Sequence, residues 1–362
     1  MRTIHTDLKT AQESLSAAPY IYIYINGVNY GTASGRLISH EWIEEPYRDR
    51  AIIVLDNSDR ALDPGTLDLR GKSFSIGEGY VDANSVNRYC GDGAGTAGTP
   101  TLWVKTQHTI SMEGKVVCIL TCEGMWGLLR ELQYLPVGEE PYYDVPFGGT
   151  QTIKTIIALA LAEADMTLNA TVPDDGIIDT LKPFFSTSNT SFPNLASLIC
   201  NNPDMLLATK CYLRPEADKV FKLIYPQDAD AVDETYYSDK TPYFREYTEK
   251  YNLLIPNTII VYWGAGNDGS WDTAEELVNL ADPASATDAA SIAAYASGGF
   301  DGVVKRVYFA PRLTTKADAT LRAEAIRARL KSEELAGRLV LPYHDCSVEL
   351  YDKVLIEDLR GV

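Results

Sequence analysis

The hydrophobic pattern in the first third of the chain is that of β-strands joined by turns. Tyrosine and isoleucine alternate over residues 20–25, so both faces of this strand are apolar or aromatic, and Asn26-Gly27 is a strong signal for a tight turn. We expect residues 1–137 to form one antiparallel β-barrel or sandwich. The other elements expected in this part are a strand and an Asp/Asn-rich turn at 51–64, a strand at 74–81, a hairpin at 101–124 that turns at Glu113-Gly114, and a short closing helix at 125–132.

The middle of the chain combines helical and strand patterns. A Pro- and Gly-rich stretch at 137–151 is typical of a linker, and apolar residues then recur with the helical period over 152–166. Residues 138–245 are therefore expected to form a small α+β domain. Its other predicted elements are a second helix at 192–202 and a hairpin at 211–226 with its turn at Glu216-Ala217-Asp218.

The last third returns to strands around a long helix. Residues 316–337 have the clearest helical pattern, with Leu321 and Ile326 on one side and Gly337 as a natural C-cap. Residues 246–362 are expected to form a C-terminal β-barrel that includes this Ala-rich helix, completed by another chain or by residues outside the sequence. The other elements expected here are strands around Pro256-Asn257, a strand at 303–311, two weak Ala-rich helices between 273 and 299, and two final strands with His344-Asp345 in the turn.

Together these patterns predict a fold that is mainly β with α+β insertions: two β-barrel domains and a small α+β middle domain. The composition supports this, because 45% of the 362 residues are apolar and 23% are charged, which is enough to bury real cores. The net charge of −18 excludes a DNA-reading surface, because a surface of that sign repels phosphates. A negative wall that DNA slides past without binding remains compatible with it.

Cysteine and histidine are too scattered to predict a metal site. The six cysteines form no CxxC pair, and the four histidines are spread along the chain, so buried free thiols are expected. Cys118 and Cys122 lie four apart in a predicted strand and should point to one face. The longest apolar stretch, 156–162, is too short to cross a bilayer, and the start of the sequence lacks a signal peptide. We expect cytoplasmic synthesis and no membrane insertion.

Two glycine-containing stretches resemble phosphate loops but lack the necessary context. GTLDLRGKS, residues 65–73, has five residues between Gly65 and Gly71-Lys72, where a P-loop has four. A strand pattern follows it at 74–81, whereas a P-loop opens a helix. The Gly-rich stretch at 90–100 lacks the strand–glycine–helix order of a dinucleotide site. No nucleotide cofactor is therefore predicted.

Catalytic patterns are equally scarce. GxSxG and HExxH do not occur, and the adjacent His344-Asp345 is not a triad without a converging nucleophile. The run at Asp56, Asn57 and Asp59 lacks the glycine and glutamate of a calcium loop. Catalytic, cofactor-binding and metal-ligating residues are accordingly predicted to be none. Three carboxylate pairs are predicted to be solvated surface: Glu139-Glu140, Asp174-Asp175 and Glu333-Glu334.

The order of the parts resembles the tail hub (baseplate hub) family of bacteriophages. AIIVLDNSDRALDPGTLDLRGKSFSIGEGY, residues 51–80, is similar to the strand, turn and connector of that family's first barrel, and CEGMWGLLREL resembles its closing segment. TIKTIIALALAEA and FPNLASLICNNPDMLLATKCYLRPEADKVFKLI resemble the middle domains. YNLLIPNTIIVYWG looks like the strand that re-enters the tube, and the final helix and strand pair enters the D-x-V-x-I-x-D pattern formed by Asp352, Val354, Ile356 and Asp358.

This resemblance implies a structural virion protein and not an enzyme. Such hubs are homotrimers whose two tube-forming β-barrel domains alternate into a pseudo-sixfold ring, which joins the hexameric tail tube to the trimeric tail tip. The implied partners are the tail tube protein, the distal tail protein, the tail fibre or tip protein and the tape-measure protein. DNA would pass through without specific binding, and the location would be the virion, assembled in the host cytoplasm.

Two other functions stay open at this point. A tail-associated peptidase or cell-wall hydrolase would need a clustered site, and the sequence shows no lysozyme insertion. A carbohydrate-binding tail-tip module could use the 22 tyrosines to stack on sugars, although their strand-like spacing favours core and interface roles.

Overall fold

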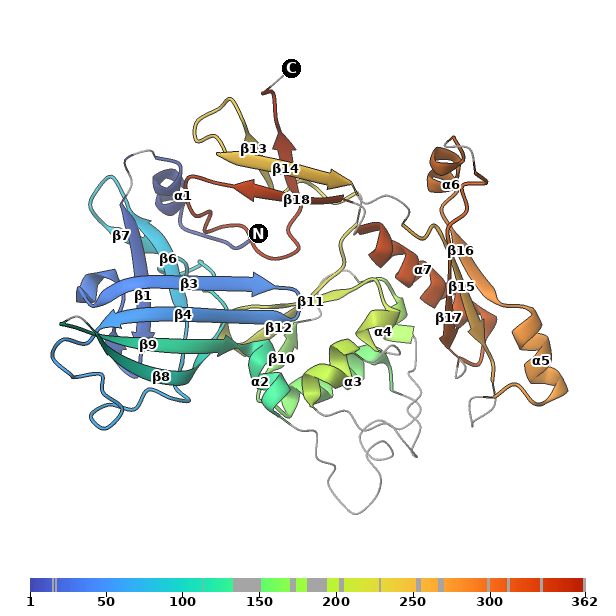
Figure 1. The fold of residues 1–362 in the computed structure, drawn as a ribbon, viewed down its shortest axis with the longest axis horizontal. Helices are drawn as coiled ribbons and strands as arrows, with labels where there is room; N and C mark the ends of the chain where they lie inside the picture. The colour runs from blue at the N-terminus through green and yellow to red at the C-terminus, as the bar shows by residue number, and fades with distance from the viewer. Residues whose placement is uncertain are drawn as a thin grey trace, which may run out of the picture.

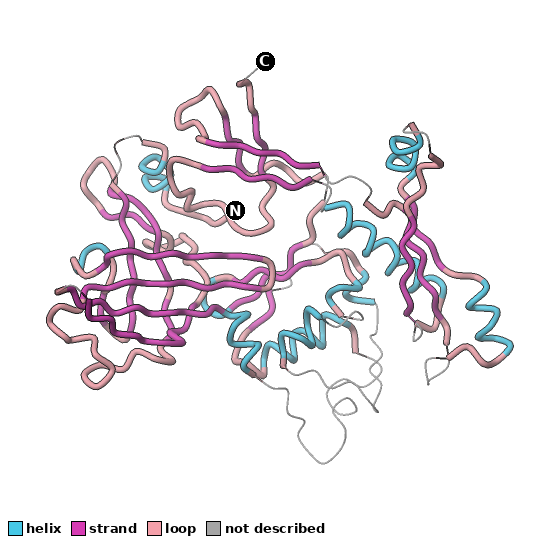
Figure 2. The backbone as a smooth tube through the Cα atoms, viewed as in Figure 1, coloured by secondary structure: helices cyan, strands magenta, loops and turns pink. Residues whose placement is uncertain are grey.

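The structure, a computed structural model, is mainly β, with curled half-barrel sheets and several helices (Figure 1). Strands dominate the N-terminal part, and helices gather between it and a separate three-stranded sheet (Figure 2). None of the helices within the described ranges is long and apolar enough to cross a membrane. The structure describes residues 1–14, 16, 18–112, 114–132, 151–169, 174–180, 194–201, 205–227, 229–251, 255–265, 270–297, 300–310, 313–332 and 335–360.

The N-terminal part consists of two antiparallel sheets that enclose one core. The five-stranded sheet has the order β3-β4-β9-β8-β5, and the four-stranded sheet has the order β2-β1-β6-β7. The predicted short helix is present as α2 (Met125–Glu131), and a further helix, α1 (Thr6–Gln12), lies near the start. The strands are β1 (Pro19–Ile25), β2 (Val28–Asn29), β3 (Leu37–Glu45), β4 (Arg48–Asp56), β5 (Ser73–Phe74), β6 (Ile76–Val81), β7 (Asn87–Tyr89), β8 (Leu102–Met112) and β9 (Lys115–Gly124).

Alternating residues of these strands build the core. In β9, Cys118, Leu120 and Cys122 point inward and are fully buried, which confirms that the two cysteines share one face. They lie beside inward-pointing aliphatic residues of the neighbouring strand β4, such as Ile53 and Leu55. All six cysteines are buried free thiols, as predicted. Burial of this apolar face is the main favourable contribution to the folding of this part.

The turn chemistry predicted for this part is confirmed. Asn26 and Gly27 have φ of 51° and 84°, the left-handed conformation that a two-residue hairpin turn requires. The hairpin of β8 and β9 is paired up to Met112 and Lys115. GKS at 71–73 leads from a turn with Gly71 at φ 74° directly into β5, so it is a connector into a strand and opens no helix.

The middle part forms a three-stranded sheet, β10-β12-β11, packed against helices. The predicted hairpin is confirmed, because β11 and β12 are antiparallel with their turn at 216–219. The apolar face of α3 is buried in a core that continues from Trp126 of α2 to Ala325. The elements are α3 (Ile153–Ala162), β10 (Thr167–Asn169), α4 (Ile177–Thr180), a π-helical turn (Ser197–Asn201), a 3-10 turn (Leu206–Ala208), β11 (Tyr212–Pro215) and β12 (Val220–Ile224).

The next unit is the separate three-stranded sheet, ordered β16-β15-β17 and backed by α7 on one face. Small residues make this close packing possible: Ala284 and Ala286 of the sheet and Ala319 and Ala323 of α7 are buried together. The unit comprises β15 (Thr258–Trp263), α5 (Ala274–Ala281), β16 (Ala284–Thr287), α6 (Ala289–Ala296), β17 (Lys305–Ala310) and α7 (Lys316–Ser332).

Two expectations for the C-terminal segment are wrong. The helix predicted at 316–337 ends at Ser332, and Gly337 lies in a strand opposite Glu249. A Cβ at Gly337 would stand 2.7 Å from the Thr248 carbonyl oxygen, so this glycine permits close strand pairing and does not cap a helix. His344-Asp345 is also not the turn of a hairpin, because the strands on either side of it pair with other strands.

Those strands form two small sheets with partners far away in the sequence. β14 (Glu246–Tyr251) pairs antiparallel with β18 (Leu335–Val340). β13 (Glu234–Tyr237) pairs in parallel with β19 (Val354–Glu357). Within the described ranges, the strands of the last third thus form sheets of two and three strands, and the second barrel stays a prediction. So does the division at 137/138 and 245/246.

Candidate functional site

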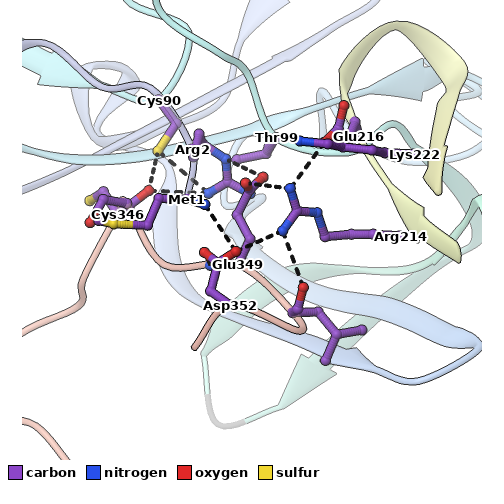
Figure 3. Close-up of polar contacts among 12 residues, drawn as sticks. Met1, Arg2, Cys90, Thr99, Arg214, Glu216, Lys222, Cys346, Glu349 and Asp352 are labelled. Atoms are coloured by element: carbon purple, nitrogen blue, oxygen red, sulfur yellow. Dashed lines mark hydrogen bonds and ion pairs between the residues drawn. The ribbon is translucent and has the colours of Figure 1, made fainter. Parts of the chain in front are cut away.

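Charged side chains from three distant parts of the chain meet in a buried cluster (Figure 3). We call it the junction cluster; it consists of Arg2, Arg214, Glu216, Glu349 and Asp352. Arg214 lies at its centre on β11, with its side chain 3% exposed. Its guanidinium group is 2.9 Å from Glu349 and from Asp352, and 3.1 Å from Glu216.

Arg2 joins the N-terminal segment to the same carboxylates. Its Nε lies 3.5 Å from Glu349 Oε1, and its Nη1 donates to the Cys346 carbonyl oxygen at 3.2 Å. The guanidinium group also lies 6.0 Å from the ring centre of Trp42 on β3. Arginine suits this position because its planar fork can serve several acceptors at once. The cluster therefore fixes the segment 345–352 against both the N-terminal sheets and the middle hairpin.

A second polar contact ties the same segment to the four-stranded sheet. Glu78 of β6 accepts from His40 of β3 at 2.8 Å and contacts His344 at 2.6 Å. We call this trio the clamp. Burial raises the pKa of Glu78, but hydrogen bonds from His344 and His40 outweigh it and lower that pKa to about 2. Burial lowers the pKa of His344, whereas its bond to Glu78 raises it above the usual value on balance.

The clamp lies in a surface groove of about 320 Å³ whose walls are largely apolar. Ile21 and Pro19 come from β1, and the other side is the segment that contains Leu341 and Tyr343. Both histidine rings are engaged with the carboxylate, so the trio acts as a fastening between two chain segments. Over the described ranges, no group of three or more His, Cys, Asp or Glu side chains could hold a metal ion. The prediction that catalytic and cofactor-binding residues are none stays a prediction.

Two more carboxylates have raised pKa values: Glu44 of β3, which is half-buried, and Asp49 of β4, which is buried. Burial raises the pKa of Glu44 to about 7 and that of Asp49 to about 6. Asp49 accepts hydrogen bonds from the backbone N–H groups of Met125 and Trp126, so it caps α2 from a neighbouring strand. Gly124 leaves room for it, because a Cβ there would stand 1.6 Å from an Asp49 carboxylate oxygen.

The outer face of the β16-β15-β17 sheet carries exposed apolar side chains on β17 and half-buried ones on β15, and within the described ranges Trp271 packs edge-on against one of them, Phe309, at 6.4 Å. Val307 and Phe309 of β17 lie opposite Ile260 and Tyr262 of β15, on the face away from α7. Phe309 is 63% exposed, and its ring stacks on Tyr262 at 5.3 Å. Leu277 and Val278 of the neighbouring α5 are also exposed. Apolar patches of this kind are typical of protein interaction surfaces.

The tyrosines of β1 form a ladder on the outside of the four-stranded sheet. Tyr22 stacks on Tyr89 at 4.5 Å and on Tyr24 at 6.0 Å. Gly77 of the intervening β6 leaves room for this stacking, because a Cβ there would stand 2.5 Å from a ring carbon of Tyr89. The ring of Tyr22 is thus stacked between those of Tyr89 and Tyr24. This favours an interface or structural role over a sugar-stacking platform.

The predicted solvated carboxylate pairs are only partly tested. Asp174 and Asp175 are half-buried, and they bind Lys154 and the backbone N–H of Lys210, so that prediction is wrong for this pair. Glu139-Glu140 and Glu333-Glu334 lie outside the described residues. The sequence analysis also missed the junction cluster. The one residue that could have indicated this cluster is Arg214, a charged residue that lies at a buried position of the predicted hairpin.

Comparisons with known proteins place the fold. No protein-family model and no curated protein matches the sequence. The crystal structure of the tail protein from Neisseria meningitidis MC58 superposes with a TM-score of 0.61 at 8% identity, covering 94% of this chain and 87% of that one. The 43 kDa tail protein of prophage MuSo2 from Shewanella oneidensis superposes with a TM-score of 0.57 at 10% identity, covering 95% and 91%. The chain has the fold of these two tail proteins.

Proposed function

We propose that this protein is a structural component of a phage tail or of a phage-derived particle. The observation that carries the proposal is the likeness of fold to the two tail proteins over nearly the full length of all three chains. A shared fold does not by itself give function. Here the likeness agrees with the sequence resemblance to tail hubs, which rests on the order of motifs and not on structure.

The finer proposal is a homotrimeric hub that forms a pseudo-sixfold ring between the hexameric tail tube and the trimeric tip. Support comes from the surfaces that the single chain leaves uncovered, above all the outer face of the β16-β15-β17 sheet. Two-stranded sheets such as β13-β19 are marginal alone and have open edges, so pairing with another chain would stabilise them. The tail tube, distal tail, fibre or tip, and tape-measure proteins are the proposed further partners.

The charge supports a channel that DNA crosses without binding. A net charge of −18 repels the phosphate backbone, and retention of DNA by such a wall would be weak at any physiological salt concentration. The proposed location is therefore the virion, after assembly in the host cytoplasm.

The proposal is tested by measuring the mass of the protein in solution and imaging it with tail tubes by negative stain. The expected particle has three times the 39.9 kDa mass of the chain and caps tube ends as a ring. A protein that stays monomeric and leaves tube ends bare would rule the hub function out.

A substitution on the apolar sheet face tests whether that surface makes the interface. Phe309→Asp should weaken assembly at least about tenfold while leaving the melting temperature nearly unchanged, because Phe309 is exposed in the single chain. Val86→Asp is the matched control, since Val86 is an exposed apolar residue in a turn of the N-terminal part. Equal assembly of both variants would remove this face from the proposed interface.

A further inference from the structure

We propose that Cys90 and Cys346 are a thiol pair that forms a reversible disulfide by exchange with a small disulfide of the glutathione class. The two residues come from distant parts of the chain: Cys90 directly follows β7, and Cys346 lies in the segment between β18 and β19. Figure 3 shows them side by side at the edge of the junction cluster. The disulfide itself does not depend on the proposed tail function. Only its expected formation as a particle leaves the cell rests on that function.

The geometry brings the two cysteines together. The Cys90 thiol donates to the Cys346 carbonyl oxygen at 3.4 Å, and Arg2 Nη1 contacts both the Cys90 sulfur, at 3.8 Å, and that carbonyl oxygen, at 3.2 Å. Both residues are nearly fully buried, and they pack with Leu8, Ala11 and Tyr80. A cysteine whose sulfur already contacts the backbone of the other needs only a limited shift to reach bonding geometry.

The surroundings favour a reactive thiolate at Cys90. Arg2 Nη1 lies 3.8 Å from its sulfur. The hydrogen bond from Cys346 and, against the opposing effect of burial, the positive charge of Arg2 lower the pKa of the Cys90 thiol to about 7. The same thiol–thiol hydrogen bond raises the pKa of Cys346, which makes Cys346 the partner that holds the proton.

The other cysteines differ in this respect. Burial raises the pKa of Cys118 to about 11 and the pKa of Cys122 and Cys211 to about 12. Because the thiolate is the attacking species, exchange should be selective for Cys90.

In the proposed exchange, glutathione disulfide is the electron acceptor. The Cys90 thiolate attacks one sulfur of glutathione disulfide, breaks its S–S bond and releases one glutathione thiolate. Cys346 then loses its proton and attacks the Cys90 sulfur, which forms the protein disulfide and releases the second glutathione. The two cysteines lose two electrons and two protons, and two glutathione thiols are formed.

The product would join residues 256 positions apart in the sequence. Such a bond would connect the four-stranded sheet to the C-terminal segment that the junction cluster and the clamp already fix. A crosslink over so long a loop restricts the unfolded chain strongly. It would form as a particle leaves the reducing interior of a cell, which keeps thiols reduced.

The experiment follows the disulfide in the full-length protein. One sample is incubated folded with excess glutathione disulfide, and a second is unfolded and refolded in the same mixture; remaining thiols are then alkylated and the peptides are mapped by mass spectrometry. The expected result in either sample is a single disulfide between Cys90 and Cys346, with Cys118, Cys122, Cys200 and Cys211 alkylated. If both samples keep Cys90 and Cys346 alkylated, or pair them with other cysteines or with glutathione alone, the inference is wrong.

Two variants make the result specific. Cys346→Ser should abolish both the disulfide and the rise in melting temperature that oxidation causes in the wild-type protein, whereas Cys118→Ser should retain both. A melting temperature that oxidation raises equally in Cys346→Ser would contradict the assignment. Peptide mapping needs no tail assembly, so a disulfide in a chain that caps no tubes would refute the tail function alone, and rings without the disulfide would refute only this inference.

Discussion

The N-terminal sheets and the small C-terminal sheets are held in place by different forces. In the first region, hairpin neighbours such as β8 and β9 pair with each other, and an aliphatic core between the two sheets is built from that region alone. In the second, β13 and β14 pair with strands about a hundred residues further along. Much of what fixes the C-terminal segment against the N-terminal sheets is polar: Glu349 meets Arg2, and Asp345 accepts from Gln12 and Tyr236.

The difference shows what each kind of contact contributes. Apolar burial supplies most of the free energy of folding but tolerates many arrangements. A buried ion pair adds little net stability compared with an apolar replacement, but loss of one partner is costly and its geometry is directional. The junction cluster therefore serves mainly to fix the position of the C-terminal segment.

The largest effect is expected from Arg214→Met. It removes the cation that Glu216, Glu349 and Asp352 share. The two buried carboxylates then keep only Arg2 (for Glu349) and the N-terminal ammonium group (for Asp352), which should lower the free energy of unfolding by about 3 kcal/mol. Chemical denaturation measures this. Arg70→Met is the matched control, because Arg70 is 60% exposed and its loss should leave the stability nearly unchanged. Similar losses in both variants would show that the junction cluster does not hold the segment.

A smaller effect is expected from Gly79→Ala in the N-terminal region. The added Cβ would stand 1.8 Å from the Arg88 carbonyl oxygen, so β7 must separate from β6 at a cost of about 1–3 kcal/mol. Gly65→Ala is the control, since nothing lies within 4 Å of a Cβ there. Thermal unfolding of the two variants compares them, and an unchanged melting temperature for Gly79→Ala would mean that β7 is not held against β6.

The smallest expected effect is a pH dependence of the free energy of unfolding that arises from the clamp. The pKa of His344 is raised above its usual 6.5 in the folded state, so its contribution is fully present below pH 6.5 and is lost as pH rises through the folded value. The pKa of Glu78 is lowered to about 2, so its contribution is present above its usual 4.5 and is lost as pH falls toward 2. Since His344 is about half exposed, screening should keep its effect below about 1 kcal/mol.

The raised pKa values of Glu44 and Asp49 act in the same direction, because ionising a buried carboxylate in the folded state is costly. Wild-type stability should thus fall between pH 5 and pH 8, and denaturation at a series of pH values measures the slope. His344→Gln should make that slope smaller only above about pH 6. An identical slope in the variant would assign the whole effect to the two carboxylates.

Local patterns predicted the elements of the first region well, and the reason is physical. A hairpin turn such as Asn26-Gly27, or the alternation in β9, is encoded within a few residues, so β1, β9 and α3 could be predicted from sequence. The pairing of β13 with β19 depends on residues more than a hundred positions apart, which no local period records. Gly337 illustrates the limit: glycine after a helical pattern is typical of a C-cap, but here the approach of β14 determines its role.

The candidate site was harder to predict than the fold. Charged residues are solvated by default, so Arg2, Glu349 and Asp352 gave no reason in sequence to expect burial. Only their convergence in space makes them partners. The same holds for the clamp, in which His40, Glu78 and His344 each come from a different part of the chain.

The contact between Arg2 and Glu349 also bears on the order of folding during synthesis, because its two residues are 347 positions apart. Ribosomes add about 5–20 residues per second, so Arg2 emerges tens of seconds before the carboxylate that it meets. The N-terminal sheets can form during this interval, whereas the C-terminal segment can be fixed against them only after residue 349 has been made. A chain terminated before residue 349 could fold these sheets but would leave Arg2 without the carboxylate of Glu349.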